Sequence, residues 1–290
     1  NMIGAMVGVQ PFGGRGLSGT GPKAGGPHYL ERLVRRAIPC VGPELPSTDQ
    51  SAGPGAEVFA SEQWPQALAA LVRAKAQGLE IDPIRRVACV GCLRELLEAR
   101  RKPMDGLDSV PDLLAALSTQ GELFLAPRAL SGPTGESNTL RLEPRGSIVC
   151  PARAGCGLAD ALIPAVAALL AGNSVLICTD GGGDELARAT RWLLAAGFPA
   201  TSIALLCQMA SGDLADLISR GDIAAVATWA PGELSALASR ALVRRSGAIL
   251  PLIDDGFGPG YLARFCHEKT VTINTTAAGG NIALLAQTPS

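Results

Sequence analysis

Apolar runs alternate with helical stretches through the second half of the chain, and this pattern limits the possible folds more than any other feature. Five runs predict strands, at 147–150, 174–178, 203–207, 224–229 and 248–254. Four stretches between them predict helices, at 159–172, 184–197, 213–219 and 232–245. Strands that are apolar at nearly every position are typical of a parallel sheet covered on both faces. The sequence therefore predicts an α/β fold, a Rossmann-like doubly wound parallel sheet.

The rest of the chain has a weaker pattern. It predicts helices at 64–78, 92–102 and 111–118, and strands at 86–90 and 122–127. Near the end, an alternating TVTIN strand is followed by a small-residue turn and a second apolar run, which predicts a strand pair or an extended flap over 269–286. The predicted parts are an orphan glycine-rich N-terminal segment (1–36), a linker rich in Pro, Gly and Ser (37–55), the Rossmann-like domain (56–262) and a C-terminal β-flap or tail (263–290).

Charge and composition narrow the classes of partner. The net charge is −1 and the sequence has no basic block, which argues against binding to nucleic acid or to an anionic membrane surface. No apolar run approaches the roughly 20 residues that a membrane-spanning helix needs. Several of the eight cysteines lie in apolar, strand-like runs, as is typical of buried thiols in a reducing compartment. We therefore expect a cytoplasmic protein.

Three separated motifs, in order, carry a resemblance to a known family. They are NMIGA with QPFGG and LSGTGPKAGGP in the first 27 residues, SGPTGESNTLRLEPRG at 131–146, and the closing stretch at 269–286. The first resembles the end of the catalytic domain of aldehyde dehydrogenases, in particular the L-glutamate γ-semialdehyde dehydrogenase module of the bifunctional proline utilization A proteins. The second and third resemble motifs of the same bifunctional proteins. The resemblance covers essentially the whole chain and identifies it as a carboxy-terminal fragment of a longer enzyme.

The resemblance implies a function for the parent enzyme. It would oxidise L-glutamate γ-semialdehyde to glutamate with NAD, and would carry an FAD-dependent proline dehydrogenase module upstream. Gly4 and Ala5 match an anchor loop whose backbone amides bind the substrate carboxylate, and Phe12 matches a residue that lines the aldehyde pocket. The thiol nucleophile and the general base of the family lie upstream, so no catalytic residue is assigned here and the fragment alone is expected to be inactive. Its expected partners are the upstream catalytic modules of the same polypeptide, with a homo-oligomer as a further possibility.

Residues 144–178 resemble the cofactor-binding half of an aldehyde dehydrogenase, but with departures. Thr179-Asp180 stands where the family has a Lys-Pro pair that holds the adenosine ribose, and Ala230-Pro231-Gly232 stands where a Gly-Ser turn meets the pyrophosphate. We therefore expect no NAD on this chain itself. The formal match Gly14-x-Gly16-x-x-Gly19 is followed by Pro22 and has no acid about 20 residues on, so it is not interpreted as a dinucleotide fingerprint.

The remaining cysteine, histidine and aspartate residues that could carry chemistry are interpreted as structural. Cys89-x-x-Cys92 lies at a predicted strand-to-helix junction, without a second such pair, so no metal site is expected. The chain has two histidines, His28 and His267, far apart in sequence, and Asp254-Asp255 ends a predicted strand. Two alternatives to the dehydrogenase fragment stay open: a free-standing non-catalytic assembly module and, less favoured, an independent NAD-binding enzyme.

Overall fold

A six-stranded parallel sheet forms the body of the molecule. The computed structural model describes residues 6–19, 21–34, 55–76, 81–99, 109–154, 158–229 and 232–275. The order across the sheet is β1 (Glu57–Ala60), β6 (Ile203–Cys207), β5 (Ser174–Thr179), β4 (Ser147–Ala152), β7 (Ala225–Ala227) and β8 (Leu252–Ile253). The helices between the strands are α4 (Leu158–Leu170), α5 (Asp184–Ala195), α6 (Ser211–Arg220) and α7 (Glu233–Val243). The strand order reverses between β4 and β7, so the predicted doubly wound parallel sheet is confirmed.

Alternate residues of the central strands enter two separate apolar cores. Ile148, Ile177 and Leu205 pack with residues of α4 and α5, over which α2 (Pro83–Glu98) and α3 (Val110–Phe124) form a further layer. The neighbouring residues of the same strands, such as Val149 and Leu176, pack with residues of α1 (Trp64–Ala76), α6 and α7. Because both faces are buried, the strands have no polar face, which explains their continuous apolar sequence.

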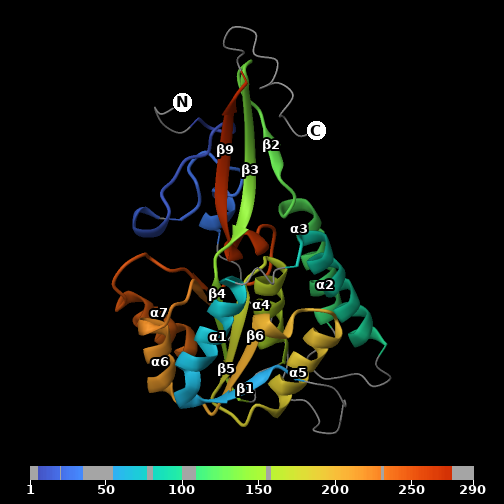
Figure 1. The fold of residues 1–290 in the computed structure, drawn as a ribbon, viewed down its shortest axis with the longest axis vertical. Helices are drawn as coiled ribbons and strands as arrows, with labels where there is room; N and C mark the ends of the chain where they lie inside the picture. Colours follow the sequence, from blue (N-terminus) through green and yellow to red (C-terminus); the bar gives the residue numbers. More distant parts are fainter. Residues whose placement is uncertain are drawn as a thin grey trace.

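A long antiparallel arm projects from this body (Figure 1). It consists of β2 (Arg128–Leu130), β3 (Glu136–Pro144) and β9 (Cys266–Asn274), with β3 in the middle. The β3–β9 register runs over nine residue pairs, from Glu136 opposite Asn274 to Pro144 opposite Cys266. Thus β9 pairs with a strand more than a hundred residues earlier, and the expected partner run at 281–286 lies outside the described residues. The arm joins the body where β3 leads into β4 and where the 3-10 turn Leu262–Phe265 (η5) leads into β9.

The N-terminal segment, residues 6–34, lies beside the arm on the β9 side (Figure 1). It contains two short 3-10 turns, Gly16–Ser18 and Leu30–Leu33, and two isolated bridges, Met6 with Gln10 and Phe12 with Ala24. With no regular element longer than one turn among its described residues, the segment depends on tertiary contacts for its shape.

Three expectations for the first half of the chain are corrected. Residues 86–90 are helical rather than a strand, because Asp82 caps the start of α2 by accepting a 3.1 Å hydrogen bond from the Arg85 amide and Pro83 occupies the first turn. Residues 122–124 continue α3, and the strand begins only at Arg128. The edge strand β1 was not predicted, since its four residues precede a stronger helical pattern. Of the predicted linker, only Gly55 lies within the described residues.

Candidate functional site

Of the three residues predicted to bind the substrate, the structure describes only Phe12. Gly4 and Ala5 lie outside the described residues. Phe12 exchanges backbone hydrogen bonds with Ala24, at 3.1 and 2.8 Å, and its side chain is 64% exposed. An aromatic ring held by a backbone bridge and facing outward is available to line a pocket formed with another module. The role of these three residues in substrate binding stays a prediction.

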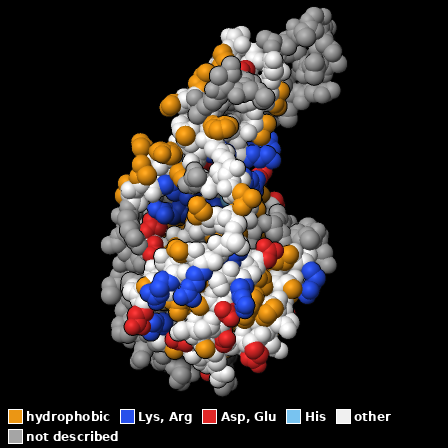
Figure 2. All heavy atoms as spheres, turned by 90° about the vertical axis from the view of Figure 1, so that its left-hand side faces the viewer, with side chains coloured by type: hydrophobic (Ala, Val, Ile, Leu, Met, Phe, Trp, Pro, Cys, Tyr) orange, Lys and Arg blue, Asp and Glu red, His pale blue; other side chains and the backbone are white. Residues whose placement is uncertain are grey.

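Other apolar side chains of the N-terminal segment are exposed as well. Val7 is 82% exposed and Leu17 is 84% exposed, and Leu30 and Leu33 also have most of their surface in solvent. Figure 2 shows hydrophobic side chains gathered over the upper part of the molecule, which holds the arm and the N-terminal segment. An apolar surface of this kind is typical of an interface with another protein part.

Hydrogen bonds tie the N-terminal segment to the arm along the length of β9. The Gln10 side chain donates to Glu136 of β3 at 2.9 Å, and the Thr270 hydroxyl of β9 donates to the Pro11 carbonyl at 2.9 Å. Further down, the Arg32 guanidinium donates to the Ala263 carbonyl of η5 at 2.7 Å. These contacts join residues more than a hundred positions apart, so no local sequence pattern could have predicted them.

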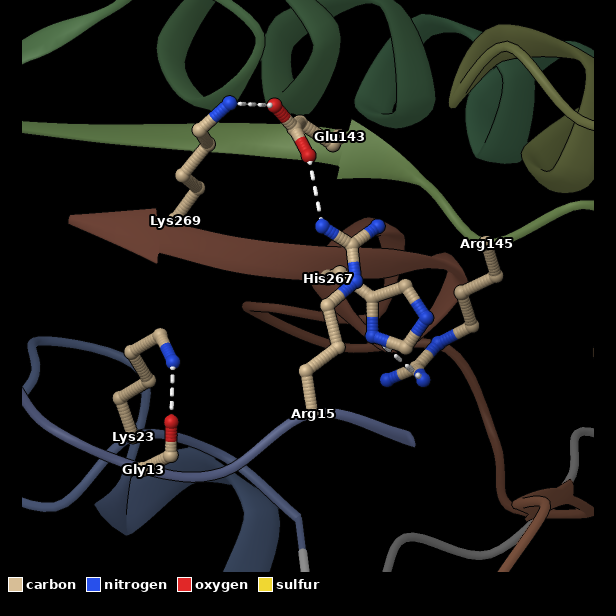
Figure 3. A network of polar contacts seen from close by, with 7 residues as sticks. All are labelled: Gly13, Arg15, Lys23, Glu143, Arg145, His267 and Lys269. Atoms are coloured by element: carbon tan, nitrogen blue, oxygen red, sulfur yellow. Dashed lines mark hydrogen bonds and ion pairs between the residues drawn. The ribbon is translucent and has the colours of Figure 1, made fainter. Parts of the chain in front are cut away.

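Glu143 forms the centre of the polar contacts at the arm (Figure 3). One carboxylate oxygen accepts a hydrogen bond from Lys269 of β9 and the other accepts one from Arg15 of the N-terminal segment, both at 2.9 Å. Hydrogen bonds from Lys269 and then Arg15 lower the pKa of the Glu143 carboxyl. The cation of each pair is about half exposed, so neither pair adds much to the stability of the fold. The Arg15 pair positions the N-terminal segment on the arm, and the Lys269 pair joins β9 to β3.

Arg145 and His267 lie at the base of the arm, beside this network (Figure 3). The Arg145 Nε donates to the Arg264 carbonyl at 2.7 Å, and its Nη1 lies 3.3 Å from Nδ1 of His267. Burial is the main cause that lowers the pKa of Arg145 to about 10. Burial, followed by the charge of Arg145, lowers the pKa of His267 to about 4.

The second histidine lies at the same junction. His28 is buried, its ring packs edge-on against Phe124 with centroids 5.1 Å apart, and its Nδ1 lies 3.8 Å from a Glu31 carboxylate oxygen. Burial lowers the pKa of His28. His28 and His267, far apart in sequence, are thus both placed where the N-terminal segment meets the rest of the chain. The sequence did not reveal that the two histidines share this junction, because only the pairing of β3 with β9 brings His267 to the N-terminal segment.

A hollow lies at the carboxyl edge of the parallel sheet, where ligands bind in doubly wound folds. Its volume is about 360 Å³, and its lining includes Cys178, Thr179, Asp180, Leu214, Leu234 and Leu237. Asp180 accepts a 2.6 Å hydrogen bond from the Ala154 amide, and Arg153 pairs with Glu233 at 2.7 Å beside it. The hollow therefore presents Thr179 and the carboxylate of Asp180 at the two positions of the Lys-Pro pair in the resembled family. Of the Ala230-Pro231-Gly232 turn, only Gly232 lies within the described residues.

The cysteine pair lies inside helix α2 and not at a strand-to-helix junction, which corrects the sequence prediction. Cys89 is buried and Cys92 is exposed. Burial, and then the neighbouring Cys92, raises the pKa of the Cys89 thiol, so little reactive thiolate forms. Within the described ranges, no three His, Cys, Asp or Glu side chains are grouped in a way that could hold a metal ion.

Replacing both Cys89 and Cys92 by alanine is expected to lower the free energy of unfolding by about 1–2 kcal/mol, through lost packing at Cys89. Cys92→Ala alone is exposed and should change it by less than about 0.5 kcal/mol. Chemical denaturation of the two variants and of the wild type checks this. A loss of parent activity at unchanged melting temperature would show that the pair has a chemical role instead.

No family model matches the chain, but individual proteins do. The bifunctional protein PutA of Escherichia coli K12 is 34% identical over 293 residues, covering 98% of this chain and 18% of PutA. PutA of Rhizobium meliloti is 30% identical over 295 residues, covering 99% of this chain and 19% of PutA. The chain therefore spans about a fifth of the length of these relatives.

Solved structures of proline utilization A proteins also resemble this chain. A crystal structure of a bifunctional proline utilization A protein superposes with a TM-score of 0.60 at 27% identity, covering 73% of this chain and 23% of that one. Indole-3-acetaldehyde dehydrogenase in complex with NAD+ gives a TM-score of 0.55 at 18% identity, covering 66% and 42%. At that identity the second likeness shows the fold alone, which is that of an aldehyde dehydrogenase domain. In the part of the chain that the structure describes, no helix is long and apolar enough to cross a membrane.

Proposed function

From the relation of this chain to a segment of the bifunctional PutA proteins, we propose that it is part of an enzyme that oxidises proline to glutamate. An FAD-dependent module upstream would perform the first oxidation. An NAD-dependent module would then oxidise L-glutamate γ-semialdehyde, with a thiol nucleophile and a general base that also lie upstream. With buried and free thiols among its described cysteines, the chain suits the reducing cytoplasm.

We assign the N-terminal segment to the end of the semialdehyde dehydrogenase module. Gly4 and Ala5 would hold the substrate carboxylate with their backbone amides, and Phe12 would line the aldehyde pocket. The exposed ring of Phe12 and the exposed Val7, Leu17 and Leu30 support this role, because burying them against the rest of the module would remove a large apolar surface from water.

The α/β body is proposed to be a non-catalytic scaffold. The lining of the hollow at the carboxyl edge of the sheet supports this. It holds Asp180 and Glu233 as well as Arg153 and Arg240, so it presents no net positive charge to the phosphates of a dinucleotide. The body instead supplies the two attachment points of the arm, the turn after β3 and η5.

The arm is proposed to hold the end of the catalytic module in place and to help cover the path of the intermediate between the two modules. The observation that carries this proposal is the set of contacts that fix the N-terminal segment on β3 and β9, with Arg15 on Glu143 and Pro11 on Thr270. A segment of the catalytic module bound to the arm means that the arm lies against that module.

Titration of NAD into the purified chain tests the scaffold role. We expect no saturable heat in a calorimeter at NAD concentrations up to about 1 mM, a range that would detect a Kd in the usual micromolar range of cofactor binding. The same preparation should form no NADH from glutamate semialdehyde. The full-length enzyme, which should bind NAD and form NADH, is the positive control. Saturable NAD binding to the chain alone would instead favour the independent NAD-binding enzyme.

A further inference from the structure

The geometry at the base of the arm fixes the protonation state of His267. Its Nδ1 lies 3.3 Å from Nη1 of Arg145. A guanidinium has donors and no acceptor, so Nδ1 must accept through its lone pair and the imidazole must be neutral, with its hydrogen on Nε2. Arg145 is fixed on its other side by the 2.7 Å bond from Nε to the Arg264 carbonyl. The ring of His267 therefore completes a link between the end of β3, η5 and the start of β9.

The charges that face His267 are mostly positive. Arg145 follows β3, and Arg15 and Lys23 come from the N-terminal segment. Among the described residues, Glu143 is the carboxylate that faces the ring, and it already accepts hydrogen bonds from Arg15 and Lys269. An imidazolium at this place would lose its bond from Arg145 and meet these cations at short range.

We propose that His267 is an acid-sensitive switch that controls how firmly the N-terminal segment docks on the arm. A proton taken up from solvent at Nδ1 removes the acceptor of Arg145 and adds a positive charge beside Arg15. Separation of the N-terminal segment from β9 relieves part of this repulsion, because it moves Arg15 and Lys23 away while Arg145 stays beside the ring. This property belongs to the chain itself and holds whether or not the proposed activity of the parent is right.

The sign and size of the effect follow from linkage. His267 has a pKa of about 4 when docked, against an ordinary value of 6.5. Its contribution to docking is complete above pH 6.5 and is lost as the pH falls from 6.5 towards 4. At pH 5 the docking equilibrium should weaken by up to about 30-fold.

His28 provides a matched comparison at the same junction. It is also buried, but the groups near its ring include the carboxylates of Glu31 and Glu268 as well as Arg32 and Arg128. Carboxylates can compensate a proton on His28, whereas a proton on His267 faces cations. His28→Asn should therefore leave most of the acid response in place.

Hydrogen exchange of the whole chain at pH 7.5 and pH 5.0, corrected for the intrinsic exchange rate, tests the switch. We expect protection over 6–34 and 266–275 to fall by up to about 30-fold at pH 5.0, with β4 and β5 unchanged as the control for folding. His267→Asn keeps an oxygen that can accept from Arg145 and cannot take up a proton, so it should abolish most of the response. Equal protection of the wild type at both pH values, or a full response in His267→Asn, would overturn the proposal.

A titration by NMR gives a second readout that needs no His267 variant. The chain has two histidines, so two ring signals appear, and His28→Asn assigns them. The His267 signal should titrate with a midpoint near 4, together with shifts in the amides of the N-terminal segment. A midpoint near 6.5 would show that the ring is not held as an acceptor, and the proposal would be wrong.

Discussion

Replacing Phe265 by alanine is expected to lower the free energy of unfolding by about 3–5 kcal/mol, the usual cost of removing a large buried aromatic side chain. Phe265 is fully buried, and its ring packs edge-on against Tyr261 with centroids 5.3 Å apart. It belongs to the core that α3 and α4 share with η5, the turn from which β9 leaves the body. Its loss should therefore weaken the body and the attachment of the arm together.

Chemical denaturation measures this change, with Leu17→Ala as the control. Leu17 is an equally apolar side chain of the N-terminal segment, but it is 84% exposed, so its truncation should cost less than about 0.5 kcal/mol. A change below about 1 kcal/mol for Phe265→Ala would contradict the packing described for η5.

Five of the six strands of the parallel sheet could be predicted from sequence, because each forms a local apolar run. The run 174–178 is apolar at every position after Ser174, and each of the first four runs is followed by a predicted helix. Gly172, at a φ of 88°, and Asn173 follow the end of α4. The sequence pattern did not reveal that the Asn173 side chain also donates to the Phe265 carbonyl at 3.0 Å and accepts from the Gly146 amide at 2.9 Å.

The errors come from short apolar runs and from long-range pairing. Residues 86–90 have a strand-like composition, but a cap at Asp82 and burial of Cys89, Val90 and Leu93 on one face favour a helix. The TVTIN strand was recognised, whereas its partner was not, because β-pairing depends on contacts that no window of sequence contains. The junction of Glu143, His267 and the N-terminal segment depends on that pairing and was missed for the same reason.

Removing all residues after Glu268 is expected to dismantle the arm while the body stays folded. The truncation deletes six of the nine residue pairs between β3 and β9. It also removes Lys269, which donates a hydrogen bond to Glu143, and Thr270, which donates one to the Pro11 carbonyl. Among the residues that the structure describes, neither core of the parallel sheet contains one after Cys266, so the sheet should keep its packing. Only three residue pairs between β3 and β9 then remain beside the N-terminal segment. We expect the segment to lose most of its contacts with the arm.

The most direct test of the central claim is coupled turnover of proline to glutamate in the full-length enzyme with and without the residues after Glu268. Circular dichroism and exchange protection of β4 and β5 first establish that the truncated enzyme is folded. If the arm holds the end of the catalytic module and covers the path of the intermediate, the truncated enzyme forms NADH more slowly and after a longer lag than the intact one. Identical lag and rate in a folded truncation would contradict the proposed role of the arm.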